Sequence, residues 1–276
     1  MPETFAGLSL DEPIVMGIIN VTPDSFSDGG ETAAHSAAIT RGREMLAAGA
    51  RILDVGGEST RPGAPPVSIA AELARVVPVI EALRDTDAVI SIDTRHPEVM
   101  AAAVEAGAGV INDVTALSHD PQSVTVAADL GVPVILMHMQ GEPGTMQANP
   151  HYDDAPLEVR NYLKERIDVC LAAGILASQI AVDPGIGFGK SVDHNLQILN
   201  RIDLLMGLGC PVVLGVSRKS FIGKVAGGDH PQDRLAGSLS CAVAARAEDV
   251  GIYRVHDVAE TVQALKVFDA ILSASS

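Results

Sequence analysis

A unit that recurs eight times along the chain limits the possible folds more than any other feature of this sequence. Each unit is a short apolar run followed by a longer stretch with helical periodicity. The runs predict strands at residues 14–20, 52–57, 89–94, 110–114, 132–138, 180–183, 211–217 and 252–256. The stretches predict helices at residues 36–48, 69–84, 97–106, 122–130, 157–173, 193–206, 234–249 and 258–272.

The alternation of strands and helices indicates the fold class. Strands that are apolar at nearly every position are typical of a parallel sheet covered by helices. Eight such units predict a (β/α)8 barrel, and we expect residues 1–276 to form a single domain of this kind. The alternative is a doubly wound open sheet, which is disfavoured because no GxGxxG motif follows the first strand.

Charge and composition argue against several classes of protein. The formal net charge of −16 argues against nucleic acid or an anionic membrane surface as a partner. No apolar stretch reaches the roughly 18 residues that span a bilayer, and the N-terminus does not resemble a signal peptide, so we expect a cytoplasmic protein. Cys170, Cys210 and Cys241 are odd in number and widely spaced, which predicts reduced, buried thiols.

Polar residues gather directly after the predicted strands. The carboxyl ends of all strands of a barrel meet on one rim, where active sites are assembled. The rim residues, in chain order, are Asn20, Thr22, Asp24, Glu58, Ser59, Thr60, Arg61, Asp93, Thr94, Arg95, Asn112, Asp113, His138, Asp183, Ser217, Arg218, Lys219, Ser220, Arg254, His256 and Asp257. The opposite strand ends are preceded mainly by Gly, Ala and Pro. This asymmetry predicts an enzyme rather than a barrel kept for its shape.

Two of these rim segments predict an anion site. The tetrad "SRKS" at 217–220 combines an arginine, which grips pairs of oxygens, with a lysine, which is a mobile point charge. A short helix that begins here would add backbone N–H groups. Arg254 and His256 alternate along the last strand and so point to the same side. The alternative for the tetrad is a solvated basic turn, and the alternative for His256 is a histidine buried in the core.

Asp93, Asn112 and Asp183 end three different strands and suggest a site for a flat heterocycle. A carboxylate accepts two N–H bonds from an N–C–N edge, and an amide reads a neighbouring donor and acceptor. The alternative for each residue is that it caps the helix that follows.

The glycine-rich segment "DPGIGFGKS" at 183–191 is not a phosphate-binding Walker motif, because position 184 is a proline. Its glycines allow a tight loop that presents Phe188 at the barrel mouth, although a purely structural turn is an alternative. No His-x-His follows the first strand, so zinc is disfavoured. A magnesium ion held by one amide oxygen, water and substrate phosphates fits the first loop better.

Eight motifs together resemble those of the dihydropteroate synthases, the folate-pathway enzymes that sulfonamides inhibit. The motifs run from the first predicted strand to the last, and so the resemblance covers almost the whole chain. They are "GIINVTPDSFSDGG" (17–30), "DVGGESTRPGA" (54–64), "SIDT" (91–94), "IND" (111–113), "LMH" (136–138), "DPGIGFGK" (183–190), "SRKSFIG" (217–223) and "RVHD" (254–257).

The resemblance implies a reaction and a set of site residues. The family joins 4-aminobenzoate to a dihydropterin methyl diphosphate and releases pyrophosphate. Asp93, Asn112, Asp183 and Lys219 would hold the pterin, and Asn20 would bind Mg2+. Thr60, Arg61, Arg254, Val255 and His256 would contact the diphosphate end of that substrate. Thr60, Pro62, Phe188, Lys219 and Ser220 would line the aminobenzoate pocket, and Arg61, Asp93, Asp183 and Lys219 would be catalytic.

Two alternatives remain open beside this reading, namely a pterin-binding methyltransferase domain and a non-catalytic pterin-binding barrel. Neither requires Arg61, Lys219, Arg254 and His256 as a set. The resemblance also suggests a homodimer, for which the Ala-rich stretch 234–247 offers an apolar face. The sequence leaves the role of Glu58 unexplained beyond a salt bridge to an unidentified cation.

Overall fold

The computed structural model describes residues 2–22, 30–59, 66–142 and 144–274. Within these residues, eight parallel strands form one sheet in the order β8-β7-β6-β5-β4-β3-β10-β9. The strands are β3 (Ile14–Asn20), β4 (Ile52–Gly56), β5 (Val89–Asp93), β6 (Val110–Asp113), β7 (Val134–Met137), β8 (Ile180–Asp183), β9 (Val213–Leu214) and β10 (Ile252–Val255).

The two ends of this sheet meet. Val182 of β8 forms a parallel bridge with Val212, and its backbone N–H donates to the Pro211 carbonyl at 2.9 Å. The sheet is therefore closed, which confirms the (β/α)8 barrel and excludes the open doubly wound sheet. The predicted seventh strand, 211–217, is regular only at Val213–Leu214, because the chain turns away soon afterwards to form the site.

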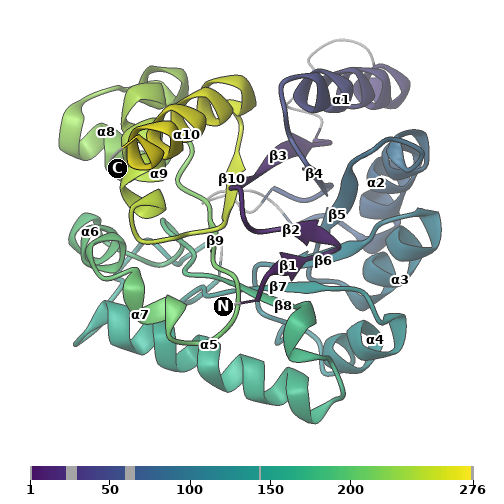
Figure 1. Ribbon diagram of the computed structural model, residues 1–276. Helices are drawn as coiled ribbons and strands as arrows, with labels where there is room; N and C mark the ends of the chain where they lie inside the picture. The colour runs from purple at the N-terminus through teal and green to yellow at the C-terminus, as the bar shows by residue number, and fades with distance from the viewer. Residues whose placement is uncertain (1, 23–29, 60–65, 143, 275–276) are drawn as a thin grey trace.

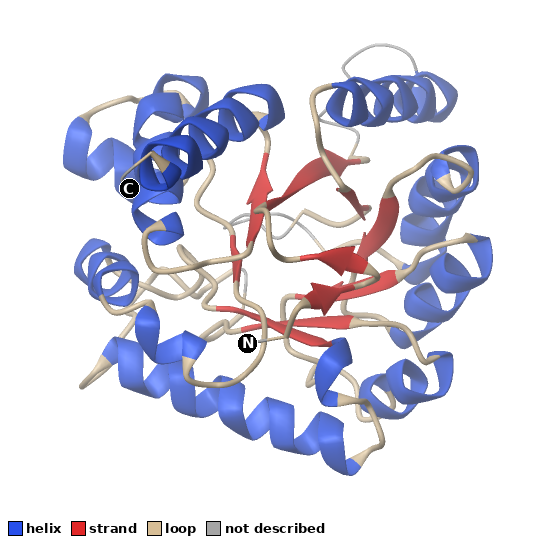
Figure 2. Cartoon of the chain, in the orientation of Figure 1, coloured by secondary structure: helices blue, strands red, loops and turns tan. Residues whose placement is uncertain are grey.

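Helices surround the barrel on its outside (Figures 1 and 2). They are α1 (Gly30–Ala47), α2 (Ile69–Leu83), α3 (Pro97–Ala106), α4 (Ser123–Leu130), α5 (Ala155–Ala172), α6 (Val192–Asn200), α7 (Asp203–Met206), α8 (Ser220–Ala226), α9 (Leu235–Arg246) and α10 (Val258–Ser273). The single helix expected at 193–206 is two helices, because the backbone of Arg201 (φ −125°, ψ 37°) leaves the helical region. None of the helices in the described ranges is long and apolar enough to cross a membrane.

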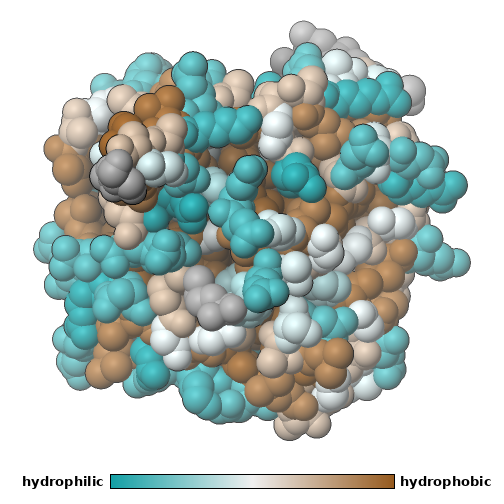
Figure 3. Space-filling model, viewed as in Figure 1, coloured by the Kyte–Doolittle hydropathy of each residue, from teal (hydrophilic) through white to brown (hydrophobic). Residues whose placement is uncertain are grey.

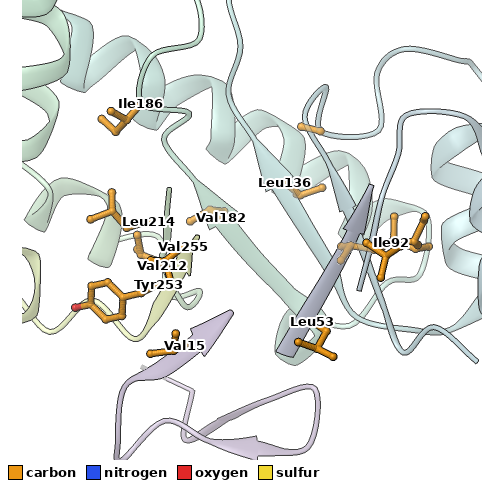
Figure 4. Close-up of a cluster of buried hydrophobic side chains, with 14 of the residues drawn as sticks. Val15, Leu53, Ile92, Leu136, Val182, Ile186, Val212, Leu214, Tyr253 and Val255 are labelled. Atoms are coloured by element: carbon orange, nitrogen blue, oxygen red, sulfur yellow. The ribbon is translucent and has the colours of Figure 1, made fainter. Parts of the chain in front are cut away.

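The largest apolar cluster lies between the sheet and the helices. It contains the outward-facing residues of the strands, for example Val15, Leu53, Ile92, Leu136 and Tyr253 (Figure 4). Every second strand residue points the other way, into the barrel, because side chains alternate along a strand. The three cysteines are free as expected, although Cys241 is only partly buried, and burial raises the pKa of each thiol.

A small hairpin, not anticipated from the sequence, closes the amino-terminal end of the barrel. It pairs β1 (Thr4–Phe5) with β2 (Leu8–Ser9). Its turn residues Ala6 and Gly7 both have positive φ (51° and 76°), as in the turns that suit two-residue hairpins. Phe5 and Leu8 pack on the inward-facing apolar residues of the strands, which are Ile14, Met16, Ile52, Val110, Ile135, Ala181, Val213 and Ile252. Within the described part of the chain, the hairpin thus covers the amino-terminal end of the barrel, and the polar interior opens toward the carboxyl ends of the strands.

Candidate active site

A hydrogen-bonded network of four side chains crosses the carboxyl-terminal half of the barrel. Asp54 of β4 accepts bonds from Asn112 Nδ2 of β6 at 3.1 Å and from Arg254 Nε of β10 at 2.6 Å. Arg254 Nη2 also donates to Asp93 Oδ2 of β5 at 2.6 Å. The four side chains meet because each stands at an inward-facing position of its strand, one layer above the apolar residues.

Charge in this network is shared between one cation and two carboxylates. Burial raises the pKa of Asp93 to about 7, although Arg254 opposes the shift. Burial disfavours the charge on Arg254, but the carboxylates of Asp54 and Asp93 outweigh this cost and raise its pKa. Arg254 is therefore a permanent cation, and Asp93 is a carboxylate whose charge depends on what else donates to it.

Asp183 and Lys219 form the second part of the site. Asp183 ends β8 and accepts the backbone N–H of Gly185 at 2.7 Å. Burial raises the pKa of Asp183, and the Gly185 N–H and the Lys219 charge oppose this. Burial lowers the pKa of Lys219 to about 8, against the attraction of Asp183. Lys219 Nζ lies 4.1 Å from the centre of the Phe188 ring and so contacts an aromatic face, while the Asp183 carboxylate acts on it electrostatically.

The capping alternative for the three strand-end residues does not hold. The residues before α3, α4 and α6 are His96, Gln122 and Ser191, and none of these helices is capped by Asp93, Asn112 or Asp183. The neighbouring Asp113 instead has a local role, because its carboxylate accepts the N–H groups of Thr115 and Leu117. Asp93, Asn112 and Asp183 are left to present carboxylate and amide groups to the inside of the barrel.

The loops after β9 and β10 are tied to each other beside the network. Ser217 Oγ lies 3.1 Å from both the backbone N and the Nδ1 of His256. Arg218, which has a φ of 59°, turns outward and donates through Nε to Asp257 Oδ2 at 2.9 Å. Of the two cations of "SRKS", Lys219 therefore faces the site, and Arg218 joins the two loops.

The remaining predicted site residues have different positions. Asn20 ends β3 on the inward face, and Ser220 is exposed at the start of α8. The side chain of Val255 packs into the outer apolar cluster, so the predicted contact with substrate would have to come from its backbone. Thr60, Arg61 and Pro62 lie outside the described residues.

Two residues of the site gain a role that the sequence did not reveal. Asp54 was not among the predicted site residues, although it is fully buried at the junction of Arg254 and Asn112. The available signal was a carboxylate in the middle of the apolar strand "ILDVG". Glu58 was unexplained, and it accepts two bonds from Arg95, at 3.1 and 3.0 Å.

A magnesium ion is compatible with the donors at the rim. Within the described ranges, no group of three or more His, Cys, Asp or Glu side chains is arranged to hold a metal. Mg2+ usually keeps several waters and takes its other ligands from substrate phosphates and one or two protein oxygens, which the Asn20 amide can supply.

Comparisons with known proteins agree with this geometry. A family model described as "Pterin binding enzyme" matches residues 16–256. The chain is 50% identical to the dihydropteroate synthase of Escherichia coli K12 over 268 residues, which cover 97% of this chain and 94% of that protein. It is 45% identical over 258 residues to the dihydropteroate synthase of Synechocystis, with 93% and 89% covered.

Solved structures show the same likeness. The Xanthomonas albilineans dihydropteroate synthase with 4-aminobenzoic acid has a TM-score of 0.91 and 50% identity, covering 97% of this chain and 96% of that chain. The Yersinia pestis dihydropteroate synthase in a sulfonamide complex has a TM-score of 0.92 and 46% identity, with 99% and 100% covered. Fold, inward-facing polar residues and family match together define a pterin-binding barrel enzyme. Within that class, the chain belongs to the dihydropteroate synthase family.

Proposed function

We propose that this protein condenses 4-aminobenzoate with (7,8-dihydropterin-6-yl)methyl diphosphate and forms 7,8-dihydropteroate and pyrophosphate in folate biosynthesis. The observation that carries the proposal is the convergence of Asp93, Asn112, Asp183 and Lys219 on the inside of the barrel. The relatives support it, since one solved Xanthomonas albilineans dihydropteroate synthase is a complex with 7,8-dihydropteroate.

The pterin ring fits the inner part of the site. Its N–C–N edge presents N–H donors, which the carboxylates of Asp93 and Asp183 accept, and Asn112 supplies a further polar contact. Arg254 holds Asp93 in place, and Asp54 holds Asn112 and Arg254. These three bonds join inward-facing positions across the barrel, so the polar groups are held in place before the ligand arrives.

The aminobenzoate ring fits the outer part of the site. Phe188 provides an aromatic wall, and Lys219 lies across its face. Ser220 follows Lys219 directly and offers a hydroxyl at the rim, and Thr60 and Pro62 remain predicted contacts of the same ring. Since Lys219 borders both parts, the two substrates meet there.

The diphosphate fits the rim, where we place Thr60, Arg61, His256 and the outer edge of Arg254. A magnesium ion held by Asn20 would neutralise charge on the departing diphosphate when it is bound. His256 is oriented for this contact by Ser217, whose hydroxyl lies 3.1 Å from its Nδ1. The Asn20 role makes a prediction of its own, because replacing the amide with alanine should raise the Mg2+ concentration needed for half-maximal rate.

The reaction in this site is a displacement with dissociative character. The methylene C–O bond breaks first, and its electron pair leaves with the diphosphate. The electron-rich pterin carries the positive charge that develops, and the buried carboxylates Asp93 and Asp183 stabilise that charge electrostatically. The amine lone pair of 4-aminobenzoate then forms the new C–N bond, and the nitrogen loses a proton.

Two other functions fit less well. A pterin-binding methyltransferase domain expels no diphosphate, and a non-catalytic barrel expels nothing. Neither accounts for Lys219, Arg254 and His256 on one side of the pterin site. The named relatives are synthases, which also favours the condensation.

We also propose a homodimer and a cytoplasmic location, the second from the sequence alone. Hydrophobic side chains lie on the surface over α10 (Figure 3), and Val267, Ile271 and Leu272 there are 55%, 63% and 57% exposed. The neighbouring α9 exposes small residues such as Ala236, Ser240 and Ala244. Together these faces suit a second copy of the chain. Sedimentation of a single species at twice the chain mass would support the homodimer.

A direct assay tests the proposed function. The protein is mixed with the pterin diphosphate, 4-aminobenzoate and Mg2+, and pyrophosphate is measured over time. We expect release that needs both substrates and is lost in the Lys219→Ala variant. Release no faster than in that variant would overturn the assignment.

A further inference from the structure

The loop after β8 has a backbone that turns several carbonyl groups toward one point. Gly185, Gly187 and Gly189 all have positive φ, at 64°, 87° and 62°. Such angles cost glycine little and other residues more. The alternation of these glycines with Ile186 and Phe188 folds the segment back on itself beside the end of β7.

The point on which the carbonyls converge is occupied by the side chain of Lys190. Its Nζ lies 3.0 Å from the Gly185 carbonyl, 3.0 Å from the Phe188 carbonyl and 3.4 Å from the His138 carbonyl. It is also 2.9 Å from His138 Nδ1. The residue is only 2% exposed, so water does not compete for these contacts.

The contacts favour a protonated lysine, because three backbone carbonyl oxygens surround one nitrogen. An ammonium group has three N–H donors for them, whereas a neutral amine has only two. Burial lowers the pKa of His138 to about 2, so its ring is neutral, and the tautomer that is protonated at Nε2 offers Nδ1 as an acceptor. Burial lowers the pKa of Lys190 well below its usual value and the Lys219 charge lowers it further, whereas the Asp183 carboxylate opposes the shift.

Close packing against the surrounding backbone leaves the loop little freedom to adopt another conformation. A Cβ at Gly185 would lie 1.9 Å from the His138 carbonyl oxygen, and one at Gly189 would lie 2.2 Å from the Gln140 carbonyl oxygen. Tyr152 donates its hydroxyl to the Gly189 carbonyl at 2.9 Å. The loop is thus packed against the segment after β7, with the ammonium group at the centre of the contact.

Two residues of the proposed active site depend on this contact. The Phe188 carbonyl binds Lys190, while the Phe188 ring lies under Lys219. Gly185 binds Lys190 through its carbonyl and Asp183 through its N–H. One buried charge therefore holds the aromatic wall of the outer pocket and orients a carboxylate of the inner pocket.

We propose that Lys190 is a positioning residue for the condensation, acting as an internal cation around which the loop 184–189 is built. It touches neither substrate, and it acts through Phe188 and Asp183. This inference rests on the proposed function only where Phe188 is taken to face aminobenzoate. The claim that the ammonium group fixes the loop does not depend on the proposed function, and a separate measurement tests it.

Kinetics of a Lys190→Met variant test the positioning role, with Lys164→Met as the matched control. Lys164 is an exposed lysine of α5 that pairs with Asp168. We expect the KM for 4-aminobenzoate to rise about tenfold or more in Lys190→Met, because displacement of a substrate contact by ~1 Å costs up to ~100-fold. The KM for the pterin diphosphate should change less, since Asp93 and Asn112 remain. Values within about twofold of Lys164→Met for both substrates would overturn the proposal.

A fluorescence measurement tests the loop without using activity. The chain contains no tryptophan, so Phe188→Trp places a single reporter in the loop. Adding Lys190→Met should lower the emission anisotropy of Trp at position 188 and relieve its contact with Lys219. Unchanged anisotropy and intensity would show that Lys190 does not fix the loop. If the parent releases no pyrophosphate, the proposed function fails, but this reporter still decides the structural part.

If Lys190→Met does not fold, Lys190→Ala with added propylammonium replaces it. Propylammonium supplies the atoms that alanine lacks, including the charge. We expect it to restore folded protein and aminobenzoate binding, and n-propanol, which is neutral, to restore neither. Equal rescue by both compounds would mean that the site needs volume rather than charge, and would overturn the proposal.

Discussion

A buried glutamate behind the active site leads to a stability prediction with a definite sign. Glu72 lies on α2, its side chain is fully buried, and neither of its oxygens has a hydrogen-bond partner among the described residues. Burial, reinforced by the charge of Glu58, raises its pKa from 4.5 to about 7, against the Thr94 hydroxyl and nearby arginines. His96 Nε2 is 3.9 Å away, and burial lowers the pKa of that ring, so it gives little compensation at neutral pH.

The raised pKa makes the ionised form of Glu72 a cost to the folded state. Because the folded protein binds this proton more tightly than the unfolded chain, stability falls as the pH rises from about 4.5 to about 7 and stays lower above that. A shift of this size corresponds to about 3 kcal/mol between the two ends of the window. Glutamine has the shape of the protonated acid and no charge. Glu72→Gln should therefore stabilise the protein by about 2–3 kcal/mol at pH 8 and change it little at pH 4.5.

Urea denaturation of parent and variant at pH 4.5, 6, 7 and 8 measures the effect. The control is Glu58→Gln, which removes the same charge from a neighbouring residue that has a partner. Glu58 accepts two bonds from Arg95 and one from the Val67 N–H at 3.3 Å. Its replacement should lower the free energy of unfolding at pH 8, opposite in sign to Glu72→Gln.

Two outcomes would refute the reasoning. One is a Glu72→Gln variant that is less stable than the parent at pH 8, which would mean that the carboxylate is satisfied in the folded state. The other is an equal change at pH 4.5 and pH 8, which would mean that shape rather than charge decides the effect.

Three further predictions concern the barrel interior. Arg254→Met leaves Asp54 and Asp93 without their cation and should lower the free energy of unfolding by about 3 kcal/mol. The control Arg201→Met removes an exposed arginine and should change it little. Equal losses in the two variants would contradict the buried network. Because the pKa of Lys219 is about 8, kcat/KM for the pterin diphosphate should fall as the pH rises through 8, and a flat profile to pH 10 would count against its ammonium form. Asp183→Asn should lower kcat more than pterin binding, and equal losses would remove its role in charge stabilisation.

Much of the fold follows from the sequence because the periodic signal is long and repeated. Each predicted strand is present, and its neighbours in the sheet are those that a barrel requires. The hairpin Thr4–Ser9 was missed because strands of two residues are too short to show a period. The split between α6 and α7 was missed because it depends on the conformation of Arg201, and no glycine or proline marks it.

The site is predictable in its residue types more than in its contacts. Asp93, Asn112 and Asp183 stand at strand ends, where the barrel directs them inward, and position alone indicates them. The partners of Arg254 do not follow from position, since Asp54 and Asp93 lie 200 and 161 residues away in the sequence. The carboxylate of Asp54 in an apolar strand is unusual, but its partners appear only when the closed barrel brings β4, β6 and β10 around the same interior. The role of each proposed contact with substrate stays a prediction.

The division of charge within the site bears on how an acidic protein handles an anionic substrate. At the pterin site, the described carboxylates of Asp54, Asp93 and Asp183 face the cations Arg254 and Lys219, with Lys190 held behind them in the loop 184–189, and Arg254 already donates to two of the carboxylates. This interior suits a ring that gains positive charge and is a poor place for a diphosphate.

The negative charge must therefore be met at the rim, which is where Arg61, His256 and a magnesium ion are predicted to lie. The methylene C–O bond of the pterin diphosphate then lies between an interior that favours positive charge and a rim that favours negative charge. Breaking it moves positive charge toward the carboxylates and negative charge toward the rim cations, so both shifts are favourable. A nucleophile that attacked before the bond had weakened would gain less from either region, and for this reason the charge pattern favours the dissociative order of events.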